Sequence, residues 1–268
     1  MNNMPIIDVK DLVKDFGDIR AVDGLSFSVE QGEIFAFLGP NGAGKSSTIK
    51  MLTTLLLPTS GVLSVSGFDP VSQQDEVRRS FGIVFQDPSL DDELTAWENM
   101  EFHGVLYGVE KKLRRARIEE LLDFVGLADR RNDQVKEFSG GMKRRLEIAR
   151  GLIHHPKILF LDEPTLGLDP QTRNHIWEHL SRLNRDEGMT IFFTTHYMEE
   201  ADRAAGRVAI IDRGRIIELD TPAKLKERAD HSASLEDAFL FFTGLAIREE
   251  DVGAVDRLRT HAARWNRR

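Results

Sequence analysis

The 268-residue sequence contains no cysteine, which excludes disulfide bonds, a thiolate nucleophile and a cysteine-ligated zinc site. Long apolar stretches are also absent, since none reaches the roughly 18 consecutive residues that a membrane-spanning helix requires. The first residues carry charges at Asp8, Lys10, Asp11 and Lys14 and lack the apolar core of a signal peptide. We therefore expect a chain of the cytosol, for which any role at a membrane requires a partner.

Positive charge is scarce as well, because 36 lysines and arginines face 44 aspartates and glutamates, for a formal net charge of -8. Such a surface has no general attraction for nucleic acid or for an anionic membrane, so we expect no nucleic-acid partner. The end of the chain is locally basic, with arginines at Arg257, Arg259, Arg264, Arg267 and Arg268. This segment is either a solvated helix face or tail, the commoner case, or a patch for a membrane or a partner.

The apolar content of 41% is ordinary for a globular protein and excludes general disorder. Residues 34–38 form a continuous apolar run between glycines, which predicts a strand buried on both faces. Residues 25–29 alternate with period two. Further strand patterns occur at residues 158–161, 190–194, 208–211 and 215–217. These runs predict a central parallel sheet.

The region from about residue 87 to 156 has helical character. Thr95 and Glu98 form the pattern of a capping box, and residues 113–125 carry apolar side chains at helical spacing. Strand patterns before and after this region indicate one α/β core with an inserted helical subdomain. From Thr221 and Pro222, an expected N-cap and first helical residue, we expect helix to the end of the chain.

Residues 39–46, between the buried strand and an expected helix at 46–57 that Pro58 closes, match the phosphate-binding pattern G-x-x-x-x-G-K-S/T. Glycines there allow backbone N–H groups to turn toward phosphate oxygens, and the helix N-terminus adds partial positive charge. Lys45 would bridge the β- and γ-phosphates, and the Ser46 hydroxyl would bind Mg²⁺. A glycine turn without a ligand is the alternative, which the flanking strand and helix disfavour.

Two carboxylates, Asp162 and Glu163, follow the apolar strand at residues 158–161. Asp162 would hold the magnesium hydration shell at the end of a strand beside the phosphate loop. Glu163 would face the γ-phosphate and accept a proton from the attacking water. An acidic pair after a strand is by itself usually a solvated loop, and only the phosphate loop favours the catalytic interpretation.

Ser139, Gly140 and Gly141, about twenty residues before Asp162, resemble the signature sequence of ATP-binding cassette (ABC) proteins. The resemblance covers roughly residues 4–220, with further motifs in family order: Gln86 in the Q-loop, Asp169 in the D-loop, His196 as the switch histidine and Phe16 as the adenine platform. The departures are Phe138 and Met142, where the family usually has leucine and glutamine, and Phe16, where it usually has tyrosine. We expect Phe138 and Met142 to be packing residues.

The resemblance implies an α/β P-loop NTPase fold with a RecA-like core, an N-terminal antiparallel β subdomain and an inserted α-helical subdomain. We expect the ATPase domain to span residues 4–220, with the helical subdomain at about 87–156, and a small C-terminal helical extension at 221–268. The implied ATP-binding residues are Phe16, Gly39, Pro40, Asn41, Gly42, Ala43, Gly44, Lys45, Ser46 and Ser47. The implied catalytic residues are Glu163, His196 and Gln86, and the implied metal-binding residues are Ser46, Gln86 and Asp162.

In the family, two chains dimerise around two ATP molecules with Mg²⁺, and we expect a homodimer here. Ser139, Gly140 and Gly141 of one protomer then meet the γ-phosphate held by the other, and Asp169 orders the loop that faces the opposite site. His196 would contact the γ-phosphate, and Gln86 would sense the metal and the attacking water. A single histidine or glutamine at a strand end is more often only a satisfied polar residue, so these roles depend on the whole set of motifs.

The helical subdomain of transporter members receives short helices of a membrane permease, so residues 88–107 are the expected docking region. Candidates there are Leu90, Leu94, Trp97 and Phe102, and the alternative is that these residues form the subdomain's own core. Residues 85–95, 194–202 and 235–240 resemble ATPase subunits of ABC-2 type exporters of the daunorubicin-resistance and multidrug group. This implies a peripheral protein on the cytoplasmic face of the membrane that drives export of a hydrophobic drug, lipid or polyketide.

Two other functions are compatible with a phosphate loop. A soluble ABC ATPase of translation or DNA repair would usually have two cassettes, zinc-binding cysteines or a long coiled coil, and this sequence shows one cassette and neither of the other features. A phosphotransferase would offer no account of Ser139, Gly140 and Gly141. The exporter subunit is therefore the favoured hypothesis, and the soluble remodelling ATPase is the alternative.

Overall fold

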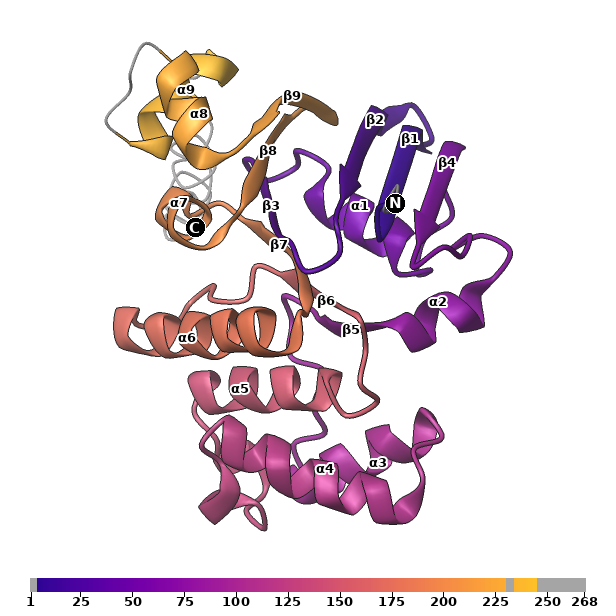
Figure 1. Cartoon of the computed structure of the whole chain (residues 1–268), viewed down its shortest axis with the longest axis vertical. Helices are drawn as coiled ribbons and strands as arrows, with labels where there is room; N and C mark the ends of the chain where they lie inside the picture. Colours follow the sequence, from indigo (N-terminus) through magenta and orange to yellow (C-terminus); the bar gives the residue numbers. More distant parts are fainter. Residues whose placement is uncertain (1–3, 230–233, 245–268) are drawn as a thin grey trace, which may run out of the picture.

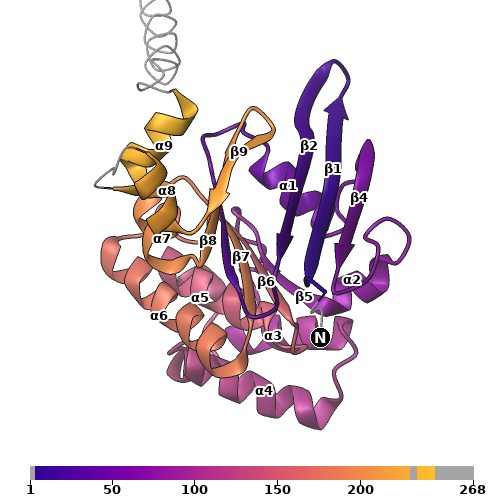
Figure 2. The ribbon, with the colours of Figure 1, turned by 45° about the horizontal axis from the view of Figure 1, so that its top comes forward.

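The computed structural model describes residues 4–229 and 234–244. The described residues form an antiparallel sheet in the order β2-β1-β4 and a larger sheet in the order β5-β6-β7-β3-β8-β9. The strands are β1 (Ile7–Phe16), β2 (Ile19–Val29), β3 (Ile34–Leu38), β4 (Ser60–Val65), β5 (Phe81–Val84), β6 (Ile158–Asp162), β7 (Thr190–Thr195), β8 (Arg207–Asp212) and β9 (Arg215–Asp220). The three-stranded sheet stands beside the larger one in Figure 2.

The described helices are α1 (Lys45–Leu52), α2 (Gln74–Ser80), α3 (Ala96–Leu106), α4 (Lys111–Phe124), α5 (Gly140–Gly151), α6 (Pro170–Glu187), α7 (Met198–Ala204), α8 (Pro222–Arg228) and α9 (Leu235–Thr243). Short 3-10 turns lie at residues 128–130 and 135–137. Helices α3, α4 and α5 form the helical part at one end of the molecule in Figure 1. Within residues 4–229 and 234–244, no helix has the length and apolar character needed to cross a bilayer.

The parallel part of the larger sheet, from β5 to β8, brings several carboxyl ends to one edge. In the registers, Leu38 of β3 lies opposite Thr195 of β7, and Asp162 of β6 lies opposite Thr194. The expected central parallel sheet is thus present, and β9 adds an antiparallel edge to it. Ligands of open α/β sheets bind beyond the carboxyl ends of the strands, so this edge is where a site is expected.

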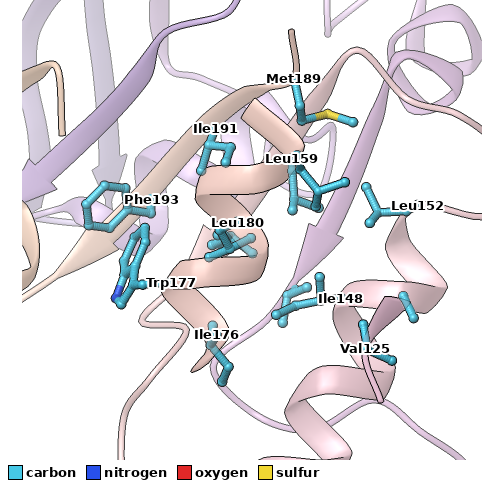
Figure 3. Packing of buried hydrophobic residues seen from close by; sticks show 14 of the residues in the cluster. Val125, Ile148, Leu152, Leu159, Ile176, Trp177, Leu180, Met189, Ile191 and Phe193 are labelled. Atoms are coloured by element: carbon cyan, nitrogen blue, oxygen red, sulfur yellow. The ribbon is translucent and has the colours of Figure 1, made fainter. Parts of the chain in front are cut away.

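Strand β3 is buried on both faces, as its continuous apolar run predicts. Phe35 and Phe37 point into a core shared with the three-stranded sheet and α1, where Phe35 and Phe192 stack at 5.6 Å between ring centroids. Ala36 and Leu38 point into the second core, against helices α5 and α6. Figure 3 shows part of this second core, where Trp177 of α6 meets Phe193 of β7 edge to face at 4.7 Å.

Several helix ends follow the local signals. Thr95 and Glu98 form the capping box at the start of α3, and Thr221 caps α8 with Pro222 as its first residue. The expectation for α1 was wrong at its C-terminus, because the helix ends at Leu52 and not at residue 57. The N–H groups of Leu55 and Leu56 both donate to the Lys50 carbonyl, at 2.8 and 3.0 Å, and so close the helix early.

The C-terminal region contains α8 and α9, which pack on each other, and α9 also packs on α7. Ser234 caps α9 through a capping box with Asp237. The prediction of helix to the end of the chain concerns residues 230–233 and 245–268 as well, and these lie outside the described residues, together with the arginines at 257–268.

Candidate nucleotide-binding site

The loop between β3 and α1 forms a turn that requires glycine. Gly44 has a φ of 103°, and a Cβ there would lie 2.6 Å from the Ala21 carbonyl oxygen, so another residue would need strained backbone and a displaced neighbour. The Lys45 side chain is buried and bends back over the loop, with Nζ donating to the carbonyls of Gly39 at 2.8 Å and Pro40 at 3.2 Å. The loop thus surrounds a lysine ammonium at the N-terminus of α1, the arrangement that binds phosphate.

Asp162 and Glu163 lie at the carboxyl end of β6, on the same edge of the sheet. The Ser46 hydroxyl and the Thr194 hydroxyl both donate to Asp162 Oδ1, at 3.3 and 2.6 Å. One oxygen atom from α1 and one from β6 therefore lie within hydrogen-bond distance of each other. Oxygen atoms are the ligands that a hard cation such as Mg²⁺ prefers. The predicted neighbours Ser46 and Asp162 are brought together by the fold.

Glu163 lies between two basic side chains. Its Oε1 is 3.4 Å from Lys45 Nζ, and its Oε2 is 2.7 Å from His196 Nδ1. The Glu163 side chain is 8% exposed, whereas that of His196 is 35% exposed. The histidine therefore connects a buried carboxylate to the surface. A carboxylate held in this way can accept a proton from a water molecule.

Thr194 is a contributor that the sequence did not reveal as a contact residue. Besides its bond to Asp162, its hydroxyl accepts a hydrogen bond from the Glu163 N–H at 3.0 Å. The hydroxyl is fully buried and fixes both acidic residues relative to β7. Thr194 lies in strand β7, which ends directly before His196, and this position was the only sequence feature that pointed to the site. Nothing in the local sequence distinguishes Thr194 from a threonine that only packs.

Other predicted residues lie on the surface. Gln86 follows β5 and is exposed, Phe16 is 46% exposed, and Ser139 and Gly140 are exposed at the N-terminus of α5. Ser139 caps that helix by accepting from the Met142 N–H at 3.3 Å. Among the described residues, no hydrogen bond or ion pair joins these residues to the phosphate loop. Phe138 is buried and Met142 packs against the core, in line with the packing roles expected for both.

Asp169, the D-loop residue, is the N-cap of α6. Its carboxylate accepts from the Thr172 hydroxyl at 2.6 Å and from the Thr172 N–H at 3.0 Å. The Thr172 side-chain hydrogen bond, followed by the backbone hydrogen bond, lowers the pKa of Asp169. The structure thus gives Asp169 a local role in starting α6, and its expected role toward a second chain stays a prediction.

The four candidate docking residues divide into two kinds. Leu90 and Trp97 are partly buried and pack against the core, and Leu94 is half-buried. Phe102 is 61% exposed on α3. Leu90 and Trp97 thus contribute to the core, whereas Phe102 does not, and docking of a partner at any of the four residues stays a prediction.

A glycine-lined loop, a buried lysine and two carboxylates at the carboxyl end of the parallel strand β6 define a phosphate-loop nucleoside triphosphatase. The family model described as ABC transporter matches residues 22–166. The chain belongs to this family and is an ATP-binding ATPase.

Curated relatives carry names that concern resistance and export, the latter in the Nod factor export ATP-binding protein I of Burkholderia lata, which is 44% identical over 84% of this chain and 74% of that protein. The chain is 46% identical to the daunorubicin/doxorubicin resistance ATP-binding protein DrrA of Streptomyces peucetius, over 84% of this chain and 69% of that protein. It is 43% identical to the linearmycin resistance ATP-binding protein LnrL of Bacillus subtilis (strain 168), over 83% and 71% of the two chains. These relatives confirm the predicted resemblance to the daunorubicin-resistance group.

Solved structures confirm the predicted fold class. An ATP-binding subunit of an ABC transporter superposes with a TM-score of 0.81 at 29% identity and covers 89% of this chain and 99% of its own. The dimeric post-hydrolysis structure of the ATP-binding cassette MJ0796, bound to ADP and Pi, superposes with a TM-score of 0.73 at 29% identity, over 80% and 98% of the two chains.

Proposed function

We propose that the chain is the ATP-hydrolysing subunit of a membrane exporter. Two copies close around two Mg-ATP and drive outward transport of a hydrophobic drug, lipid or polyketide-like substrate. The observation that carries the catalytic part is the position of Glu163 between Lys45 Nζ and His196 Nδ1. The names of the relatives support the export part, because two concern resistance to daunorubicin/doxorubicin and to linearmycin and a third concerns Nod factor export.

In this proposal the phosphate loop, residues 39–47, holds the triphosphate of ATP, and Phe16 stacks on the adenine. Lys45 turns its ammonium from the Gly39 and Pro40 carbonyls toward the β- and γ-phosphates. Glu163 takes a proton from the attacking water, and His196 holds the carboxylate and the γ-phosphate in place. Preorganised charge of this kind lowers the barrier because it needs little rearrangement during the reaction.

Mg²⁺ fits the oxygen pair of Ser46 and Asp162, whose atoms are 3.3 Å apart. Among residues 4–229 and 234–244, no group of three or more histidine, aspartate or glutamate side chains could hold a metal by itself. The ion would therefore be shared with phosphate oxygens, and Gln86 would be a further ligand. Bound there, it would neutralise developing charge on the phosphates.

A second chain completes the site in this proposal. Ser139 and Gly140 are exposed at the N-terminus of α5, where backbone N–H groups and the helix dipole favour an anion. They are free to meet the γ-phosphate held by another copy, and reciprocal contact gives a two-fold homodimer. The dimeric structure of the similar cassette MJ0796 supports such an arrangement.

The permease would dock beside the exposed face of α3, within and next to residues 88–107. Phe102, Val105 and Leu106 are 61, 54 and 66% exposed there, at the spacing of one helix face. A cavity of about 620 Å³ adjoins this face and is lined by Arg78, Arg79, Tyr107 and others. Attachment to a permease places the chain peripherally on the cytoplasmic side of the membrane.

The test uses Glu163→Gln, with Glu187→Gln at an exposed position of α6 as the matched control. We expect Glu163→Gln to keep the wild-type Kd for ATP but to lower kcat about 100- to 10,000-fold, the usual contribution of a general base. Size-exclusion chromatography with Mg-ATP should show a trapped dimer only for Glu163→Gln. Unchanged turnover, or a monomer in saturating Mg-ATP both alone and with the permease, contradicts the proposed mechanism.

The export part is tested by co-purification with the membrane protein encoded beside this chain, followed by ATPase assays with hydrophobic drugs. Co-purification and stimulation support the exporter. A chain that binds no membrane protein and hydrolyses ATP at the same rate with every drug supports the alternative, a soluble remodelling ATPase.

A further inference from the structure

Arg144 on α5 is a buried charge whose hydrogen-bonding capacity is fully used. The residue is 6% exposed, and burying a guanidinium is unfavourable unless its N–H groups find acceptors. Each of its five N–H donors faces an oxygen atom. Nε donates to the Pro164 carbonyl at 2.7 Å, Nη1 to the Phe85 carbonyl and to Glu147 Oε2, and Nη2 to the Glu163 and Gln86 carbonyls at 3.0 and 3.5 Å.

The acceptors belong to two separate loops of the nucleotide site. Phe85 and Gln86 begin the Q-loop after β5, and Glu163 and Pro164 form the turn after β6 that carries the catalytic carboxylate. Four of the five oxygens are backbone carbonyls, so Arg144 fixes the path of the chain and not a movable side chain. One residue of α5 thus binds both loops directly.

Two further residues of α5 hold the Q-loop from the same helix face. Glu147 Oε1 accepts from the Ser89 N–H at 2.8 Å, and Arg150 Nη1 donates to the Ser89 carbonyl at 2.6 Å. Arg144, Glu147 and Arg150 are spaced by three residues and therefore share a face of the helix. We refer to these three residues as the Arg144 clamp. The clamp binds residues 85–89 to α5 at both ends of that segment, through Phe85 and Gln86 at its start and through Ser89 at its end.

We propose that Arg144 is a positioning residue that couples the two nucleotide sites of the dimer. The N-terminus of α5, with Ser139 and Gly140, serves the nucleotide held by the partner, whereas the Q-loop and Glu163 serve the protomer's own. Since Arg144 joins these parts, a displacement of α5 must move both loops or break hydrogen bonds of a buried charge. This inference rests on the proposed function, because only a dimer gives α5 a nucleotide to contact.

The test compares Arg144→Gln with Arg145→Gln. Arg145 is the next residue of α5 and donates to the Val125 carbonyl at 2.6 Å, so its variant removes the same charge from the same helix without touching either loop. Amide exchange by mass spectrometry, without nucleotide, should be about tenfold faster in residues 85–89 and 163–166 of Arg144→Gln. We expect kcat to fall about 100-fold, the cost of a misplaced catalytic group, with KM within twofold. Arg145→Gln should match the wild type in both measurements.

If Arg144→Gln does not fold, the same two measurements are made on Arg144→Lys. Lysine keeps the positive charge beside Glu147 but has three donors in place of five and no planar fork. We expect a folded protein with about tenfold lower kcat, unchanged KM and faster exchange in the two loops.

Wild-type exchange in both loops of Arg144→Gln or Arg144→Lys overturns the proposal, and so does a loss of activity that Arg145→Gln reproduces. Failure of the proposed function is distinguishable. In that case the wild type hydrolyses ATP without forming a dimer in Mg-ATP, while the exchange rates still report whether Arg144 holds the loops.

Discussion

Acidification should destabilise the protein through a half-buried aromatic stack between the C-terminal end of α3 and the loop after α5. The Tyr107 ring lies 4.8 Å from His103 and 3.9 Å from His154, measured between centroids. His154 Nε2 donates to the Phe81 carbonyl at 2.9 Å, so Nδ1 is the unprotonated nitrogen. Nδ1 is buried and has no hydrogen-bond partner among the described residues. A proton there would place a charge where no acceptor stabilises it.

The size of the effect follows from the pKa values. Burial, reinforced by the positive charge of neighbouring residues, lowers the pKa of His103 from 6.5 to about 3, and burial lowers that of His154 from 6.5 to about 4. Because both folded-state pKa values are depressed, the stability that the neutral histidines contribute is complete above pH 6.5 and is lost as the pH falls toward about 4 for His154 and about 3 for His103. Between pH 7.5 and 5.0, each histidine should therefore lower the free energy of unfolding by about 2 kcal/mol.

The assay is urea unfolding followed by circular dichroism at pH 7.5, 6.0 and 5.0. His154→Phe keeps a ring against Tyr107 but does not titrate, so its loss of stability over this range should be about 2 kcal/mol smaller than that of the wild type. At pH 7.5 the variant should be about 1 kcal/mol less stable, because the bond to the Phe81 carbonyl is gone. The control His155→Asn changes an exposed histidine with a φ of 60°, which asparagine tolerates. Equal pH slopes for the wild type and His154→Phe would refute the reasoning.

Two further predictions concern the nucleotide site. Lys45→Ala removes the buried ammonium of the phosphate loop, so calorimetry should show ATP affinity lowered about 10- to 100-fold, and turnover should be lost; an unchanged ATPase rate would remove the assignment of this loop. Ser139→Arg places a bulky charge at the exposed tip of α5, so ATP binding by the monomer should stay within about twofold while steady-state hydrolysis is lost. A fully active Ser139→Arg protein would mean that the signature residues play no part.

Features of the fold with local causes could be predicted from the sequence. The apolar run of β3, the glycine turn after it and the caps at Thr95 and Thr221 each depend on a few neighbouring residues, and all are present. The end of α1 was missed because it depends on which carbonyl the N–H groups of residues 55 and 56 reach, and several choices fit the same apolar pattern.

Contacts between distant segments could not be predicted in this way. Arg144 reaches acceptors 20 and 59 residues away along the chain, and in the sequence it is one basic residue among several in an amphipathic helix. Thr194 is similarly unremarkable until β7 pairs with β6 and places its hydroxyl beside Asp162. The motifs predict which residues act on nucleotide, and only the sheet order reveals which side chains hold those residues in place.

The double burial of β3 has a thermal consequence for the nucleotide site. Phe35 and Phe37 belong to one core, and Ala36 and Leu38 to the other, so the strand cannot separate from its surroundings unless both cores open together. Such openings coincide with global unfolding. The turn that starts at Gly39 is thereby anchored to a strand that is buried on both faces. On heating, nucleotide binding and the native fold should therefore be lost at the same temperature, and the site should not unfold locally before the whole protein does.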